Sequence, residues 1–255
     1  MTKISANTVF HFTNIDALAG ILQNGFYPSY SIEEYLTEDG PPFRLAFPMV
    51  CFCDIPLSQI ADHIDQYGKY GIGVSKKWAI RKKLNPVLYL EKSSLLWRRF
   101  ESVLDQNYKD VVELGKLEVK VDSMIRDRDS LMYMFMHTKP YEGFYNRNGE
   151  QRYKRFYDER EWRYVPDLKR IDRDELFLSQ NMLSEDVIKK KNAILREHSL
   201  TFDPADIQYL ILERESERME MFSMLSELGS EKYGEGEIKI LSSRIISAEQ
   251  IKNDI

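Results

Sequence analysis

Cysteine and histidine are scarce in this sequence, and each shortage argues against a class of site. Only two cysteines, Cys51 and Cys53, occur among the 255 residues, two apart in one strand-like run. A disulfide between such neighbours would be strained, so we expect reduced thiols, as in a bacterial-type cytosol. The four histidines are scattered and no second cysteine pair stands at a finger-like spacing, so the sequence indicates no metal site.

Long apolar runs are also missing. No run approaches the roughly 18 residues that a membrane span requires, and the opening MTKISANTVF lacks the apolar segment of a secretory signal. We therefore expect a cytoplasmic protein with no membrane partner. The net charge of −5 argues against wholesale wrapping by nucleic acid, while a local basic groove stays open.

The residues that are present predict one mixed domain. At 43% hydrophobic, the chain can bury a large core. Short strands alternating with helices predict an α+β fold, in a single domain of residues 1–255. A long, charged, helical pattern predicts an insertion at residues 93–138, which extends with a following loop to about residue 150. We expect loops at residues 29–42 and 140–156, and a last strand within residues 239–246.

The stretch YDEREWRYVP places Glu159 and Glu161 two apart, where a strand is predicted. On a strand both carboxylates would share one face, and unpaired carboxylates are costly to bury. One interpretation is an edge strand with a solvated face, or an ion pair between Glu161 and Arg163. The other is a carboxylate aimed into a cleft, where it could stabilise positive charge, bind a ribose hydroxyl or act as a base.

Other candidate residues lie earlier in the chain. His11 stands between two phenylalanines on the first predicted strand, where a lone histidine is usually a hydrogen-bonded structural residue. The run YGKYGIGV contains three glycines with Tyr67 and Tyr70. Glycines let a backbone approach a ligand closely, and tyrosine offers a stacking face. The spacing matches neither a dinucleotide fingerprint nor a phosphate-binding loop, so turn glycines beside packed tyrosines are the alternative.

The segment 141–160 interleaves aromatic with basic side chains. Such a pattern suits single-stranded nucleic acid. It equally suits a loop that is pinned by its aromatic rings and carries solvated charges.

Several segments, in chain order, resemble the AbiGi family of bacterial abortive-infection proteins. They are HFTNIDALAGILQNGFYPSY, VCFCDIPLSQIADHIDQYGKYGIGVSKKWAI, NPVLYLEK, YDEREWRYVP and PADIQYLIL, and they cover most of the chain. The resemblance implies phage defence, as the antitoxin-like half of a two-gene system. The chain would then be a non-catalytic antitoxin or a sensor, and its expected partner is a cognate toxin, a phage protein or RNA.

A second resemblance is to ADP-ribosyltransferases. It is carried by a first-strand histidine, a tyrosine near a glycine-rich strand and a late Glu-x-Glu strand. It implies a split, strongly bent β core around a cleft for NAD, the substrate. In that arrangement His11 would bind the adenosine-side ribose, Thr13 would assist at the ribose, and Tyr67 or else Tyr70 would stack on nicotinamide.

The same resemblance assigns roles to the two glutamates. Glu161 would contact the nicotinamide ribose and stabilise an oxocarbenium-like state, and Glu159 would orient the acceptor, a nucleic acid or a protein. Both would line a wet cleft, while Trp162 and Tyr164 would pack on the opposite side of the sheet.

Overall fold

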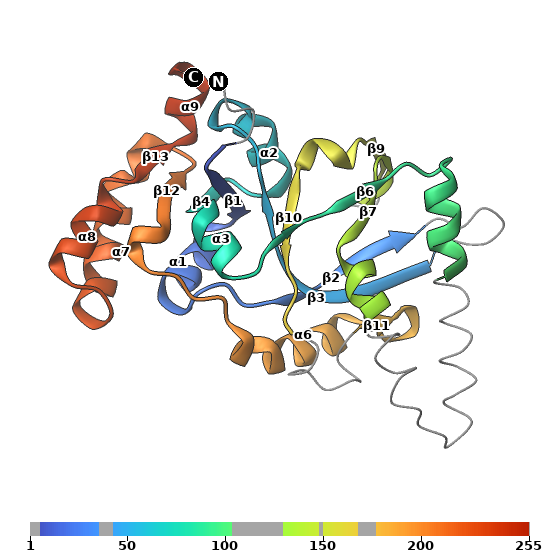
Figure 1. Cartoon of the computed structure of the whole chain (residues 1–255). Helices are drawn as coiled ribbons and strands as arrows, with labels where there is room; N and C mark the ends of the chain where they lie inside the picture. Colours follow the sequence, from blue (N-terminus) through green and yellow to red (C-terminus); the bar gives the residue numbers. More distant parts are fainter. Residues whose placement is uncertain (1–5, 36–42, 104–129, 148–149, 168–176, 255) are drawn as a thin grey trace.

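The computed structural model describes residues 6–35, 43–103, 130–147, 150–167 and 177–254. Most of its strands belong to one mixed sheet (Figure 1). In chain order the strands are β1 (Thr8–Thr13), β2 (Ser29–Tyr35), β3 (Phe43–Cys53), β4 (Tyr70–Ser75), β5 (Asn85–Pro86), β6 (Leu88–Leu90), β7 (Thr138–Pro140), β8 (Gly143–Arg147), β9 (Glu150–Lys154), β10 (Glu161–Tyr164), β11 (Leu178–Ser179), β12 (Ile207–Leu212) and β13 (Ile245–Ser247).

The large sheet contains nine of the strands in the described part of the chain, ordered β13-β12-β4-β1-β3-β10-β5, with β2 and β11 both paired to β3. The β12–β13 pair is parallel, whereas β1, β3, β4 and β10 pair with antiparallel neighbours. Strands β6 and β7 form one small sheet, and β8 and β9 form another. Figure 1 shows both on the opposite side of the molecule from β12 and β13.

Helices pack against both faces of the sheet. They are α1 (Ile15–Asn24), α2 (Ile60–Tyr67), α3 (Lys76–Arg81), α6 (Glu185–Ile194), α7 (Arg218–Glu231), α8 (Glu235–Ser242) and α9 (Ala248–Asp254), with further helical residues at 95–103 and 130–136. Among the described residues, no helix combines the length and apolar character that crossing a bilayer needs.

Capping residues fix the helix ends. Asn14 begins α1 by accepting a hydrogen bond from the N–H of Ala17 at 2.8 Å, and Gly25 ends it with a φ of 81°. Gly68 ends α2 with a φ of 142°, and a Cβ added there would lie 2.3 Å from the carbonyl oxygen of Thr13. Only glycine fits at that position, which sets the direction of the chain just after Tyr67.

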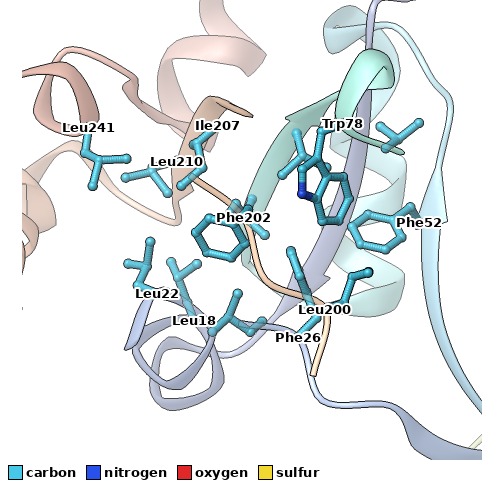
Figure 2. Packing of buried hydrophobic residues seen from close by; sticks show 14 of the residues in the cluster. Leu18, Leu22, Phe26, Phe52, Trp78, Leu200, Phe202, Ile207, Leu210 and Leu241 are labelled. Atoms are coloured by element: carbon cyan, nitrogen blue, oxygen red, sulfur yellow. The ribbon is translucent and has the colours of Figure 1, made fainter. Parts of the chain in front are cut away.

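Two apolar layers enclose the sheet. On one face the cluster around Leu18, Phe52 and Trp78 brings α1, α3 and the C-terminal helices onto the strands (Figure 2). On the other face Phe10 and Ile64 belong to a second cluster, under α2 and α9. The α+β class is therefore confirmed, with a mixed sheet. The expectation of a single domain stays a prediction.

The predicted helical insertion is confirmed in part, at residues 95–103 and 130–136, while 104–129 lie outside the described residues. Three other expectations were wrong. Strand β2 replaces the loop expected at 29–42, because it pairs along β3. The hairpin of β8 and β9 replaces the loop at 140–156. Helix α8 takes much of the expected last strand, which shrinks to β13.

Candidate functional site

Glu159 and Glu161 meet on one lysine, although only one of them lies in a strand. The Nζ of Lys139, in β7, is 2.8 Å from Oε2 of Glu159 and 3.0 Å from Oε2 of Glu161. Both glutamates are only 6% exposed. Two like charges can approach this closely because the ammonium between them offsets their repulsion.

The backbone around the pair differs from the predicted strand. Glu159 ends a 3-10 helix (Phe156–Glu159), Arg160 adopts a left-handed conformation with a φ of 44°, and β10 begins at Glu161. Strand β10 lies between β3 and β5, so the expectation of an edge strand with a solvated face was wrong. The alternative of an ion pair between Glu161 and Arg163 is confirmed, with Nε of Arg163 at 2.6 Å from Oε1. 

Arg163 extends the cluster towards β2. Its side chain is fully buried, and besides Glu161 it contacts Oε1 of Glu33 at 2.5 Å and donates to the carbonyl oxygen of Met136 at 2.7 Å. A guanidinium can be buried in this way because several acceptors satisfy its fixed fork of donors. Arg163 thereby ties β10 to β2 and to the end of the helical residues at 130–136.

Tyr67 and Lys154 complete the cluster on its outer side. The Tyr67 hydroxyl donates to Oε1 of Glu159. The Nζ of Lys154, in β9, lies 3.0 Å from the same carboxylate oxygen and 2.8 Å from the Tyr67 hydroxyl. The structure thus brings three of the predicted residues together: Tyr67, Glu159 and Glu161.

The cluster carries no net formal charge. Three carboxylates, from Glu33, Glu159 and Glu161, face three cations, from Lys139, Lys154 and Arg163. We call these six residues, together with Tyr67, the charge cluster. It joins α2, β2, β7, β9, β10 and the 3-10 helix, so it links both small sheets to the large one.

For Glu159, Glu161 and Lys139 in the charge cluster, burial and ion pairing shift the pKa values in opposite directions, and ion pairing has the larger effect. Burial favours a raised pKa for Glu161, but Arg163 and Lys139 outweigh it and hold that pKa well below its usual range. For Glu159, burial acts in the same direction, and Lys139 again lowers the pKa. Burial alone would lower the pKa of Lys139, yet the two glutamates raise it well above its ordinary value. All three groups are therefore charged at neutral pH.

His11 lies on the opposite face of the sheet from the charge cluster. The register pairs Phe10 with Cys53 and Cys53 with Glu161, so these three side chains share one face. Successive side chains of a strand alternate between faces, which turns His11 to the other side. The expectation of one pocket shared by His11 and Glu161 is therefore corrected, because a layer of backbone separates them.

The surroundings of His11 are those of a packed structural residue. Its ring lies 5.4 Å from that of Phe26 and 5.6 Å from that of Phe52, and its Nδ1 is 2.8 Å from the carbonyl oxygen of Cys51. Burial lowers the pKa of His11, against the opposite effect of that carbonyl, so the imidazole is neutral at pH 7.

Thr13 and Tyr70 accompany His11 on that face. They are register partners between β1 and β4. The Tyr70 hydroxyl donates to Glu217 at 3.0 Å, and partial burial together with this carboxylate raises the pKa of Tyr70 to about 12. Of the two tyrosines that the sequence offered, Tyr67 lies beside the glutamates and Tyr70 does not. The ligand-binding roles of these residues stay predictions.

Trp162 and Tyr164 alternate with the cluster residues along β10. Both pack against the apolar layer that contains Phe52, on the face away from Glu161. Their predicted placement is confirmed, and it follows directly from the alternation of side chains along a strand.

Three basic residues of segment 141–160 form ion pairs within the chain. Lys154 contacts Glu159, Arg155 lies 2.8 Å from Asp158, and Arg152 lies 2.8 Å from Glu150. Two rings of the hairpin are open, Phe144 at 49% and Tyr153 at 56% exposed. Because these cations are already paired, they offer less to a phosphate backbone, and nucleic-acid binding stays a prediction.

Sequence reasoning missed Lys139, Lys154 and Glu33. Two buried carboxylates must find cations, but the chain has 36 lysines and arginines, and no local spacing marks the partners. Within the described residues, no group of three or more His, Cys, Asp or Glu side chains could hold a metal ion.

The fold and the cluster together define a class: an α+β protein whose mixed sheet carries a neutral, buried charge cluster on one face. The chain belongs to the AbiGi family. Residues 26–213 match the family described as "Putative abortive phage resistance protein AbiGi, antitoxin". It is also similar to the "Abortive phage resistance protein AbiGi" of Lactococcus lactis subsp. cremoris, with 28% identity over 258 residues, covering 90% of this chain and 99% of that protein.

The resemblance to the AbiGi family is thus confirmed. No solved structure matches the chain. The resemblance to ADP-ribosyltransferases, including a split and bent core around a cleft for NAD, stays a prediction.

Proposed function

We propose that this protein serves abortive phage resistance as an antitoxin-type protein, which neutralises a toxin by binding it and not by catalysis. The family description supports this role. The observation that carries it is the state of the two candidate carboxylates. All four oxygens of Glu159 and Glu161 accept hydrogen bonds from Tyr67, Lys139, Lys154 and Arg163. A catalytic carboxylate needs an oxygen that faces its substrate.

A titration in cells tests this proposal. The chain is co-expressed at graded levels with the product of the neighbouring gene, the candidate toxin, and growth and complex formation are measured. A binding antitoxin rescues growth only when it matches the toxin in amount, and the two proteins co-elute. Rescue at a small fraction of the toxin level, without a complex, would overturn the proposal.

The variant Tyr67→Phe sharpens the comparison. The substitution removes a hydroxyl that donates to Glu159, while Lys154 still contacts the same carboxylate oxygen, so Glu159 keeps a partner there. If the protein neutralises the toxin by binding it, Tyr67→Phe should rescue growth as well as the wild type does. If a phage protein or RNA is the true partner, the co-expressed toxin will neither bind nor be neutralised, which also contradicts the proposal.

We expect the antitoxin activity in the cytoplasm.

An NAD-dependent ADP-ribosyltransferase is the second candidate. The contact between Tyr67 and Glu159, beside Glu161, favours it. The full residue set does not fit one NAD site, since His11 lies across the sheet, and we derive no catalytic step. Release of nicotinamide from NAD by the pure protein, abolished in Glu161→Gln with the fold retained, would establish this candidate over the first.

A further inference from the structure

A hollow of about 510 Å³ is lined by residues of β12, of β13 and of the turn before β13. Figure 1 shows these strands on the left of the molecule, on the opposite side from β7 and β9, which carry two lysines of the charge cluster. The volume of the hollow falls in the range of small-molecule sites, roughly 300–1,000 Å³. Among the described residues that line it, none carries a carboxylate. The polar lining consists of Gln208, Tyr209, Arg218, Ser243, Arg244 and Gln250, and two isoleucines supply an apolar wall.

Arg218 has a structural role at this hollow. Its Nε and Nη2 donate to Glu215 at 2.5 and 2.9 Å, and its Nη1 donates to the carbonyl oxygen of Ile245 at 2.9 Å. The guanidinium therefore has its charge balanced, and it satisfies a carbonyl of β13, the last strand of the sheet.

Arg244 differs because only neutral groups hold it. Its Nη1 donates to the carbonyl oxygen of Ile207 at 3.2 Å and to Oε1 of Gln208 at 3.1 Å. In the described part of the chain no carboxylate lies within ion-pair distance of it, and its Nε and Nη2 make no hydrogen bond. The side chain is half-buried, so a fixed positive charge with unused donors stands in the wall of the hollow.

We propose that this hollow binds a small organic phosphate through Arg244. A guanidinium presents two parallel N–H donors that match phosphoryl oxygens, and partial burial strengthens such charge-assisted bonds. The Tyr209 hydroxyl makes no hydrogen bond to another described residue and supplies a further donor. The family match ends at residue 213, so most of this lining lies beyond it and the site does not depend on the antitoxin proposal.

Calorimetry and thermal shift on the whole chain test the site. The probes are inorganic phosphate and AMP, with adenosine and acetate as the uncharged and carboxylate comparisons, all at constant ionic strength. We expect AMP and phosphate to bind, and Arg244→Gln, which keeps an amide near Gln208, to weaken AMP binding about 10- to 100-fold, as expected for a lost charge-assisted bond. Arg44→Gln, which changes an exposed arginine of β3 that pairs with Glu34 and does not line the hollow, is the matched control and should bind as the wild type does.

Three results would overturn the proposal: no binding of AMP or phosphate, equal AMP binding by Arg244→Gln and the wild type, or adenosine or acetate binding as tightly as AMP. If Arg244→Gln does not fold, Tyr209→Phe replaces it. This variant keeps the ring contact with Phe10 and should weaken AMP binding about 2- to 10-fold, the worth of one neutral hydrogen bond. Unchanged binding in Tyr209→Phe would then count against the site.

Discussion

Replacing Lys139 with methionine should destabilise this protein more than any exposed lysine change. The substitution keeps an unbranched side chain of similar length but removes the positive charge between Glu159 and Glu161. The two carboxylates, each in a residue that is only 6% exposed, would then repel each other without the ammonium between them. Neither carboxylate can reach bulk water without moving the chain, because the cluster is held by six elements.

Lys154 still contacts Glu159 and Arg163 still contacts Glu161, but three carboxylates then face two cations, so one buried negative charge is left uncompensated. The expected loss is about 3–5 kcal/mol, the usual cost of removing one partner from a buried ion pair. For a chain of this size each kcal/mol lowers the melting temperature by roughly 2–4 °C. Lys139→Met should therefore melt about 6–20 °C below the wild type. The loss should shrink as the pH falls, because protonating one glutamate relieves the repulsion.

Thermal unfolding followed by circular dichroism, at neutral and at mildly acidic pH, measures both effects. Lys239→Met is the matched control, since Lys239 pairs with Glu235 on the surface, where the two side chains are 74% and 85% exposed. Such pairs contribute little. The reasoning fails if the two variants have the same melting temperature. It also fails if lowering the pH does not reduce the difference in melting temperature between Lys139→Met and the wild type.

Three further outcomes are expected. Gly68→Ala should lower the free energy of unfolding by about 1–3 kcal/mol from backbone strain alone, and by more because of the clash with Thr13. Gly20→Ala, within α1, meets no atom within 4 Å and should raise that free energy by about 0.5–1 kcal/mol. Urea unfolding of the two variants measures the difference. Because the folded-state pKa values of Glu159 and Glu161 lie below their ordinary 4.5, the stability that they contribute is present above that pH and is lost as the pH falls further, which an acid titration would show. Hydrogen exchange should be slowest for the amides of β1 and β4, at the centre of the sheet; equal exchange at β8 would contradict this.

Local sequence determined the helix ends. Asn14, Gly25 and Gly68 act within a few residues of themselves, through a side-chain cap or a backbone conformation that few residues adopt. Such signals need no distant partner, so they can be read before the fold is known. Because successive side chains of a strand alternate, the sequence also determined that Glu161 and Trp162 lie on opposite faces of the sheet.

Strands were harder to predict than helices, because their pairing lies elsewhere in the chain. Strand β2 carries the polar residues of a loop, yet β3 pairs with it along its whole length. The Asn148-Gly149 dipeptide is typical of a hairpin, and it was the available signal for β8 and β9. The alternating isoleucines of α8 favour a strand, but Leu241 is buried in the core from a helix.

The sequence by itself determined the α+β class, the capped helices and the pair of glutamates that had to be explained. Only the tertiary structure decided what surrounds that pair, because Lys139 and Lys154 reach it from β7 and β9, and Glu33 of β2 reaches its partner Arg163. It also decided that His11 stands apart, since the face of a residue on a sheet depends on the register of strands far away in the chain. Charge in a protein interior is balanced through space, and a linear sequence does not contain those distances.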